Sequence, residues 1–337
     1  MPVWSGTGGH LGLARAAVQP QGPLRSAFRP LDRHYSCRMP QRPPWFDEDL
    51  LPYPSNWIDV DGNTVHYLDV GSGPTLLMVH GNPSWSFLYR RMIARLSESF
   101  RCVAFDHPGF GLSKAAPGYG FTAAEHSAVA RSLVEALDLT DVTVIVQDWG
   151  GPIGLAAAVR DPQRYRGLVV GNTWAWPSNL WTMGFGQIMG GPITGDLLNR
   201  RLNLFVGKML PSMMRRRRLT DAEVAMYTGP FPTPASRRPA QVLPLQIRTA
   251  RPFLADLADR LPVIAGLPSL LFWADGDIAF GEGERRRWQS LLTDRTDHLL
   301  AGAGHFWQDD IAVHYIGLEL QDDAGEEAAA VLAQWWR

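Results

Sequence analysis

The stretch Val142-Thr143-Val144-Ile145-Val146-Gln147-Asp148-Trp149-Gly150-Gly151 gives the strongest indication of how this chain folds. Residues 142–147 form a run of mostly β-branched apolar side chains, which is typical of a strand buried inside a parallel sheet. The small residues of 150–159 predict a helix that packs closely on that strand. A carboxylate, Asp148, therefore occupies the sharp turn between a buried strand and a helix, where one side chain is lifted above the sheet.

Short apolar runs and amphipathic stretches alternate on both sides of this turn. We expect strands over 64–70, 75–80, 100–105, 168–171 and 269–273, and a helix over 123–139. Such alternation predicts an α/β fold with a mostly parallel sheet and helices on both faces.

Residues 174–251 interrupt this pattern, because they contain helical stretches and prolines but no clear strand. We predict that they form a helical cap over the sheet edge, inserted into a core made of 45–173 and 252–337. The run Arg215–Arg218 is interpreted as a solvated helix face, with an anion- or partner-binding patch as the alternative.

Residues 1–44 carry six arginines against one acid and lack a continuous apolar segment. We interpret them as a disordered leader or the result of an upstream start codon, with a transit peptide as the alternative.

The composition excludes several classes of partner. The formal net charge is -1, so we expect no nucleic-acid partner, and no apolar run is long enough to span a bilayer, so we expect no membrane partner. Only Cys37 and Cys102 occur, which argues against a disulfide framework and a thiolate metal site. This composition fits a cytoplasmic protein, and it leaves the oligomeric state open.

A carboxylate at position 148 favours a particular chemistry. It is a nucleophile that needs no base, and its attack on a saturated carbon gives an ester that water can hydrolyse. A serine making the same attack would leave an ether without a carbonyl. The alternative reading of Asp148 is a simple helix cap.

Two further residues favour the catalytic interpretation. His305 lies on the glycine-rich stretch 301–305 and is a candidate base for activating water. Asp277, just after the strand 269–273, is the candidate acid that orients it, with Asp275 as the rival.

Asn82 and Trp149 flank the expected nucleophile. Their backbone N–H groups are candidates for an oxyanion hole, and their side-chain N–H groups are candidates for holding a departing anion. Alternatively, Asn82 is a turn residue before Pro83, and Trp149 serves apolar packing.

Five ordered motifs carry a family resemblance over about residues 50–337. They are HGNPSW (80–85), DHPGFGLS (106–113), VQDWGGPIG (146–154), DGDIAF (275–280) and AGHFWQDD (303–310). Together they resemble the haloalkane dehalogenases of the α/β-hydrolase fold.

This resemblance implies a hydrolase that needs no cofactor and converts a small apolar halogenated substrate and water to an alcohol. The sequence contains no HxH or HExxH pattern, so we expect no metal. It implies Asp148 as the nucleophile, His305 as the base, and Asn82 with Trp149 as the halide site. Asn172 stands at the family's other acid position, so the resemblance implies Asp277 as the acid.

Four alternatives stay open. Epoxide hydrolases share the aspartate but use two cap tyrosines, of which only Tyr227 is a clear candidate here, and more often have His where this chain has Gln147. Fluoroacetate dehalogenases use arginines beside the nucleophile, where Trp149 stands. Coelenterazine luciferases resemble the same family, and a non-catalytic binding protein is the fourth.

The aromatic residues of the predicted cap have two alternative roles, which are to line the substrate pocket or to fill the core. They are Trp176, Trp181, Phe185 and Phe205.

Overall fold

The computed structural model describes residues 42–310 and 324–336, and all of these belong to one compact unit. Of the predicted leader (1–44), residues 1–41 therefore lie outside the described residues.

An eight-stranded sheet forms the centre of this unit, with the order β1-β2-β4-β3-β5-β6-β7-β8. The strands are β1 (Ser55–Val60), β2 (Asn63–Val70), β3 (Thr75–Val79), β4 (Arg101–Phe105), β5 (Val142–Gln147), β6 (Tyr165–Gly171), β7 (Ser269–Ala274) and β8 (Arg295–Leu300). β2 pairs antiparallel with β1 and β4, and every pair from β4 to β8 is parallel. The prediction of an α/β fold with a mostly parallel sheet is confirmed, while β1 was not predicted.

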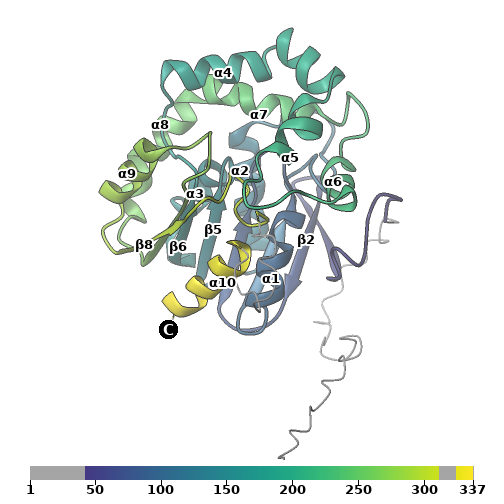
Figure 1. The fold of residues 1–337 in the computed structure, drawn as a ribbon. Helices are drawn as coiled ribbons and strands as arrows, with labels where there is room; N and C mark the ends of the chain where they lie inside the picture. The colour runs from purple at the N-terminus through teal and green to yellow at the C-terminus, as the bar shows by residue number, and fades with distance from the viewer. Residues whose placement is uncertain (1–41, 311–323, 337) are drawn as a thin grey trace, which may run out of the picture. The chain divides into compact units, whose positions relative to one another are not determined.

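Helices cover both faces of the sheet (Figure 1). α1 (Arg90–Leu96) and α10 (Ala324–Trp335) pack together on one face, and α2 (Ala123–Ala136) and α3 (Gly150–Ala158) pack together on the other. α9 (Glu282–Leu291) lies between β7 and β8 in the chain.

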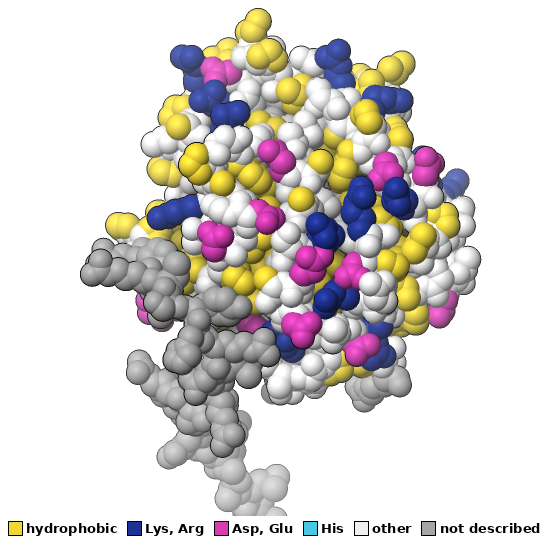
Figure 2. Space-filling view, turned by 180° about the vertical axis from the view of Figure 1, so that it is seen from behind, with side chains coloured by type: hydrophobic (Ala, Val, Ile, Leu, Met, Phe, Trp, Pro, Cys, Tyr) yellow, Lys and Arg dark blue, Asp and Glu magenta, His cyan; other side chains and the backbone are white. Residues whose placement is uncertain are grey.

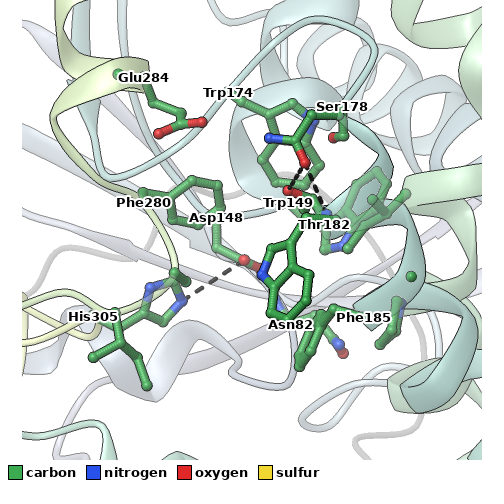
Figure 3. A pocket seen from close by; sticks show the side chains of 18 of the residues that line it. Asn82, Asp148, Trp149, Trp174, Ser178, Thr182, Phe185, Phe280, Glu284 and His305 are labelled. Carbon is green, nitrogen blue, oxygen red and sulfur yellow. Dashed lines mark hydrogen bonds and ion pairs between the residues drawn. The ribbon is translucent and has the colours of Figure 1, made fainter.

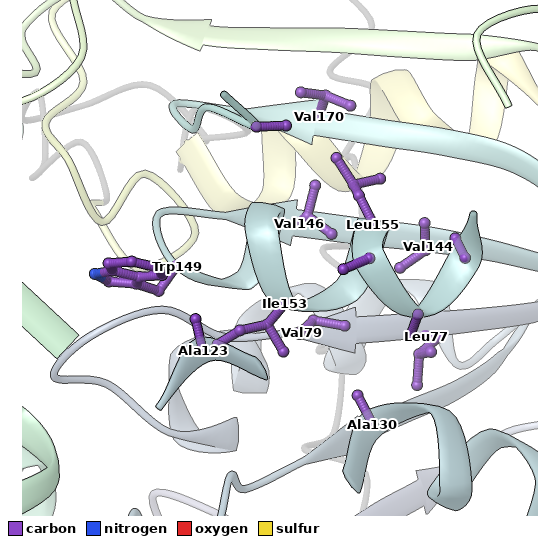
Figure 4. Packing of buried hydrophobic residues seen from close by; sticks show 14 of the residues in the cluster. Leu77, Val79, Ala123, Ala130, Val144, Val146, Trp149, Ile153, Leu155 and Val170 are labelled. Atoms are coloured by element: carbon purple, nitrogen blue, oxygen red, sulfur yellow. The ribbon is translucent and has the colours of Figure 1, made fainter. Parts of the chain in front are cut away.

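The core between α3 and the sheet positions the turn at Asp148. Ile153 and Leu155 of α3 pack against Val79 and Val146 of the central strands (Figure 4). A side chain at Gly150 would collide with the carbonyl oxygen of Val79, so only glycine lets the helix begin this close to β3. The strand and helix on either side of Asp148 are therefore held rigidly.

The chain between β6 and β7 is helical and lies above the carboxyl ends of the parallel strands (Figure 1). It contains α4 (Leu180–Gly190), two π-helical turns (Asp196–Arg201 and Phe205–Met209), α5 (Leu210–Ser212), α6 (Asp221–Thr228), α7 (Arg238–Thr249) and α8 (Arg251–Arg260). α4 and α7 pack on each other over the site.

The prediction for Arg215–Arg218 is wrong, because this run is irregular and partly buried. The side chain of Arg217 is only 6% exposed and forms ion pairs with Glu223 and Asp309. The Asp310 carboxylate accepts the backbone N–H groups of Arg215 and Arg216. Buried acids thus bind this run in place of water, and two of them, Asp309 and Asp310, lie more than 90 positions later in the chain.

The surface itself mixes charges of both signs. Lys and Arg side chains alternate with Asp and Glu side chains over the face in Figure 2. No helix among residues 42–310 and 324–336 is long and apolar enough to cross a membrane.

Candidate active site

The turn that carries Asp148 is strained. Asp148 has a φ of 50°, in the left-handed region that residues other than glycine rarely adopt. Such a conformation costs on the order of 1–3 kcal/mol and persists only where its surroundings impose it. Here the backbone N–H of Asp148 donates to the carbonyl of Asn172, and Thr173 Oγ1 donates to the carbonyl of Asp148. The strain directs the carboxylate away from the sheet and toward the cap.

Two backbone donors hold the Asp148 carboxylate. The N–H of Asn82 donates to Asp148 Oδ1 at 2.6 Å, and the N–H of Trp149 also hydrogen-bonds to the carboxylate. Burial raises the pKa of Asp148, and this effect exceeds the lowering by His305 and by the two N–H groups. These donors occupy the geometry of an oxyanion hole around the carboxylate carbon.

His305 lies across from this carboxylate, on the loop that follows β8. Its Nε2 is 3.7 Å from Asp148 Oδ2, and the dashed line in Figure 3 marks this pair. Its Nδ1 is 2.9 Å from Asp277 Oδ2. Burial alone would lower the pKa of His305, but the Asp277 carboxylate, its hydrogen bond and Asp148 together raise it above its usual value.

The structure also distinguishes the two candidate acids. Asp277 is the one that contacts His305, and its side chain is fully buried. Asp275 instead accepts the N–H of Gly302 at 2.5 Å in an exposed position. Asn172 binds the backbone of Ala274 through both atoms of its amide, so it does not face the histidine.

Asn82 and Trp149 both line the cavity above the nucleophile. Asn82 Nδ2 donates one hydrogen to the carbonyl of Ala240 in α7 at 3.3 Å, which leaves its second hydrogen for a ligand. The indole of Trp149 lies beside the carboxylate of Asp148 in Figure 3. An indole nitrogen can only donate, so both side chains suit an anion.

A cavity of about 740 Å³ separates this group from the cap. Its wall is mainly apolar and aromatic, and the four aromatic cap residues considered above all line it: Trp176, Trp181, Phe185 and Phe205. Trp176 and Phe205 are buried, whereas Trp181 is 87% exposed at the mouth. Glu284 and Arg287 line the cavity as well as Asp148 and His305, and the mainly apolar remainder of its wall suits a small apolar substrate.

Two features of the site were not predicted. Gln147 contacts the imidazole of His305, and Phe280 stacks on the same ring with centroids 5.7 Å apart. For Gln147 the sequence offered one signal, namely its position immediately before the nucleophile Asp148. Among the described residues there is no group of three His, Cys, Asp or Glu side chains that could hold a metal ion.

Comparison with known proteins defines the class first. A family model described as the alpha/beta hydrolase fold matches residues 74–310, which include β3 to β8 and the cap. The chain is thus an α/β-hydrolase, as its sheet order and strained turn indicate.

Individual relatives define the family more closely. The chain is 41% identical over 269 residues to haloalkane dehalogenase 2 of Mycobacterium tuberculosis (strain ATCC 25618 / H37Rv), covering 78% of this chain and 93% of that protein. It is 31% identical over 279 residues to cis-3-alkyl-4-alkyloxetan-2-one decarboxylase of Shewanella oneidensis, covering 78% and 86%. The crystal structure of an ancestral haloalkane dehalogenase matches with a TM-score of 0.71 at 25% identity, covering 83% and 99%. This chain belongs to the haloalkane dehalogenase family, a family of hydrolases.

Proposed function

We propose that the enzyme hydrolyses small apolar haloalkanes through a covalent alkyl ester on Asp148. The observation that carries the proposal is the arrangement around one carboxylate. Asp148 Oδ1 accepts the backbone N–H of Asn82, while Oδ2 lies 3.7 Å from Nε2 of His305, whose Nδ1 is hydrogen-bonded to the buried Asp277. Oδ1 is thus held by a donor that can stabilise an oxyanion, and Oδ2 is available for attack on the substrate carbon.

In the first half-reaction, Asp148 Oδ2 attacks the carbon that bears the halogen. A C–O bond forms while the C–X bond breaks, and the bonding electrons leave with the halide. The halide binds between Asn82 Nδ2 and the Trp149 indole N–H, since an anion in an apolar cavity needs donors. No proton moves in this step.

In the second half-reaction, His305 Nε2 takes a proton from water, and the hydroxide oxygen attacks Cγ of Asp148. The N–H groups of Asn82 and Trp149 stabilise the resulting oxyanion. Collapse breaks the ester bond, the alkoxide takes the proton from His305, and the remaining proton goes to solvent. Asp277 stabilises the imidazolium while it exists. The products are an alcohol, a halide and a proton, and the scheme uses no cofactor.

The structure offers no support for the epoxide alternative. Tyr227 is fully buried, donates its hydroxyl to Asp309 at 2.8 Å, and does not line the cavity. It is therefore not placed to polarise an epoxide oxygen above Asp148. The cytoplasmic location stays a prediction from composition.

The test is a panel of brominated and chlorinated alkanes, with epoxides and a cis-3,4-dialkyloxetan-2-one run in parallel. We expect halide release from the haloalkanes and its loss in Asp148→Ala, which removes the nucleophile. The Asp275→Ala variant is the matched control, because that carboxylate is exposed and does not contact His305. Diol formation or decarboxylation without halide release would contradict the proposal.

A further inference from the structure

Gln147 is a buried polar residue that the proposed reaction leaves without a role. It ends β5 and is fully buried, directly before Asp148. Its Nε2 lies 3.0 Å from His305 Nε2 and 3.0 Å from the backbone carbonyl oxygen of His305. Its Oε1 is buried and has no hydrogen-bond partner among the described residues.

The carbonyl contact fixes the orientation of the amide. A backbone carbonyl can only accept, so the atom of Gln147 that faces His305 O must be the NH₂ nitrogen. The second hydrogen of that nitrogen then points at His305 Nε2, which must be an acceptor. This requires the neutral tautomer with its proton on Nδ1, and Asp277 selects the same tautomer from the other side.

This hydrogen bond occupies the lone pair that must later take a proton from water. In the imidazolium form, Nε2–H would face the N–H of Gln147, donor against donor. Turning the amide over would set Oε1 against His305 O, so rotation does not relieve the conflict. Gln147 therefore opposes protonation of His305.

The remaining charged groups near His305 act in the opposite sense. The carboxylates that influence the ring are Asp277 and Asp148. Asp309 and Asp310 follow in the same loop, but their carboxylates bind arginine side chains, the Tyr227 hydroxyl and backbone N–H groups. Once Asp148 is esterified it loses its charge, which leaves Gln147 and Asp277 as the opposed influences on the base.

We infer that Gln147 is a positioning residue, which holds His305 neutral with Nε2 unprotonated during alkylation and yields that nitrogen to the hydrolytic water once Asp148 is esterified. This inference rests on the proposed function, because it divides the base's work between the two half-reactions. Its consequence for the free enzyme is independent of any substrate. The amide keeps the base unprotonated at a pH where the two carboxylates alone would charge it.

The test is Gln147→Met, which keeps the length of the side chain and removes the donor. Ring NMR of labelled histidine, with His305 assigned by its loss in His305→Phe, gives the titration of this residue without substrate. We expect the pKa of His305 to rise by about half to one unit, the equivalent of one hydrogen bond. The acid limb of the turnover–pH profile should move up by the same amount, so that turnover on that limb falls about 3- to 10-fold.

Thr143→Val is the matched control, since it removes a buried polar group from the same strand away from His305. A merely structural role for Gln147 would lower turnover at every pH without moving the titration, and that result would overturn the inference. Should Gln147→Met fold poorly, Gln147→Glu offers an acceptor and should raise the pKa further, and an unchanged pKa there would also overturn it. Halide release with an unshifted titration refutes only this inference, whereas a shifted titration without halide release refutes only the proposed reaction.

Discussion

Replacing Asp277 by asparagine should stall the reaction at the alkyl ester on Asp148, after release of one equivalent of halide. The carboxylate lies 2.9 Å from His305 Nδ1 and its side chain is fully buried. At an effective dielectric constant of about 20, a charge pair at that distance interacts by roughly 6 kcal/mol. Since each 1.36 kcal/mol of barrier is tenfold in rate, ester hydrolysis should slow by about 10³- to 10⁴-fold, in line with the loss of the acid in a Ser-His-Asp triad.

Alkylation of Asp148 does not use the base, so it should persist in this variant. Stopped-flow halide detection should then show a burst of about one equivalent per enzyme, followed by very slow turnover. Asp275→Asn is the control, because Asp275 is exposed and accepts the N–H of Gly302 rather than contacting His305. Turnover within tenfold of the parent for Asp277→Asn, or an equal loss in Asp275→Asn, would refute the assignment of the acid.

Three other predictions concern the halide site and stability. Asn82→Ala keeps the backbone N–H but loses the side-chain donor, so we expect halide formation in the burst to slow about 10- to 100-fold, the value of a hydrogen bond to a charged group; an unchanged burst would remove Asn82 from the halide site. Asp309→Ala removes the buried partner of Arg90 and should lower the free energy of unfolding by about 3–5 kcal/mol in urea titrations, whereas a change below 1 kcal/mol would contradict a buried, coupled pair. Burial lowers the pKa of His80 to about 4 and of His126 to about 3. The unfolded chain therefore binds protons below about pH 6.5 while the folded protein does not, so stability is complete above that pH and falls toward pH 4 by about 1.4 kcal/mol per unit for each histidine. Urea midpoints at pH 7, 6 and 5 should show a shallower slope in His126→Asn, and an equal slope would contradict this account.

The sequence indicates the core of the fold because its buried strands are encoded locally. The β-branched run 142–147 and the small residues after it predict β5, α3 and the turn between them, and all three are present. The preference for Asp277 over Asp275 assumed a strand that ends at Trp273, whereas β7 ends at Ala274; Asp277 nevertheless lies 2.9 Å from His305 Nδ1.

Features that depend on distant segments were not predictable in the same way. Gln147 binds a residue 158 positions later in the chain, and nothing near 147 specifies that partner. The arginine run was assigned to solvent because Asp309, which pairs with Arg217, lies 92 positions later and is brought to it only by folding. Patterns of local sequence report which face is buried, but they do not report which buried charges meet.

The most direct test of the covalent mechanism is the intact mass of His305→Phe after incubation with a bromoalkane. Without a base to activate water, the ester should accumulate, and the mass should rise by one alkyl group that peptide mapping places on Asp148. The Asp148→Ala, His305→Phe double variant should show no increase. Bromide release without any adduct in His305→Phe, or an adduct on another residue, would contradict the assignment of Asp148 as the nucleophile and His305 as the base.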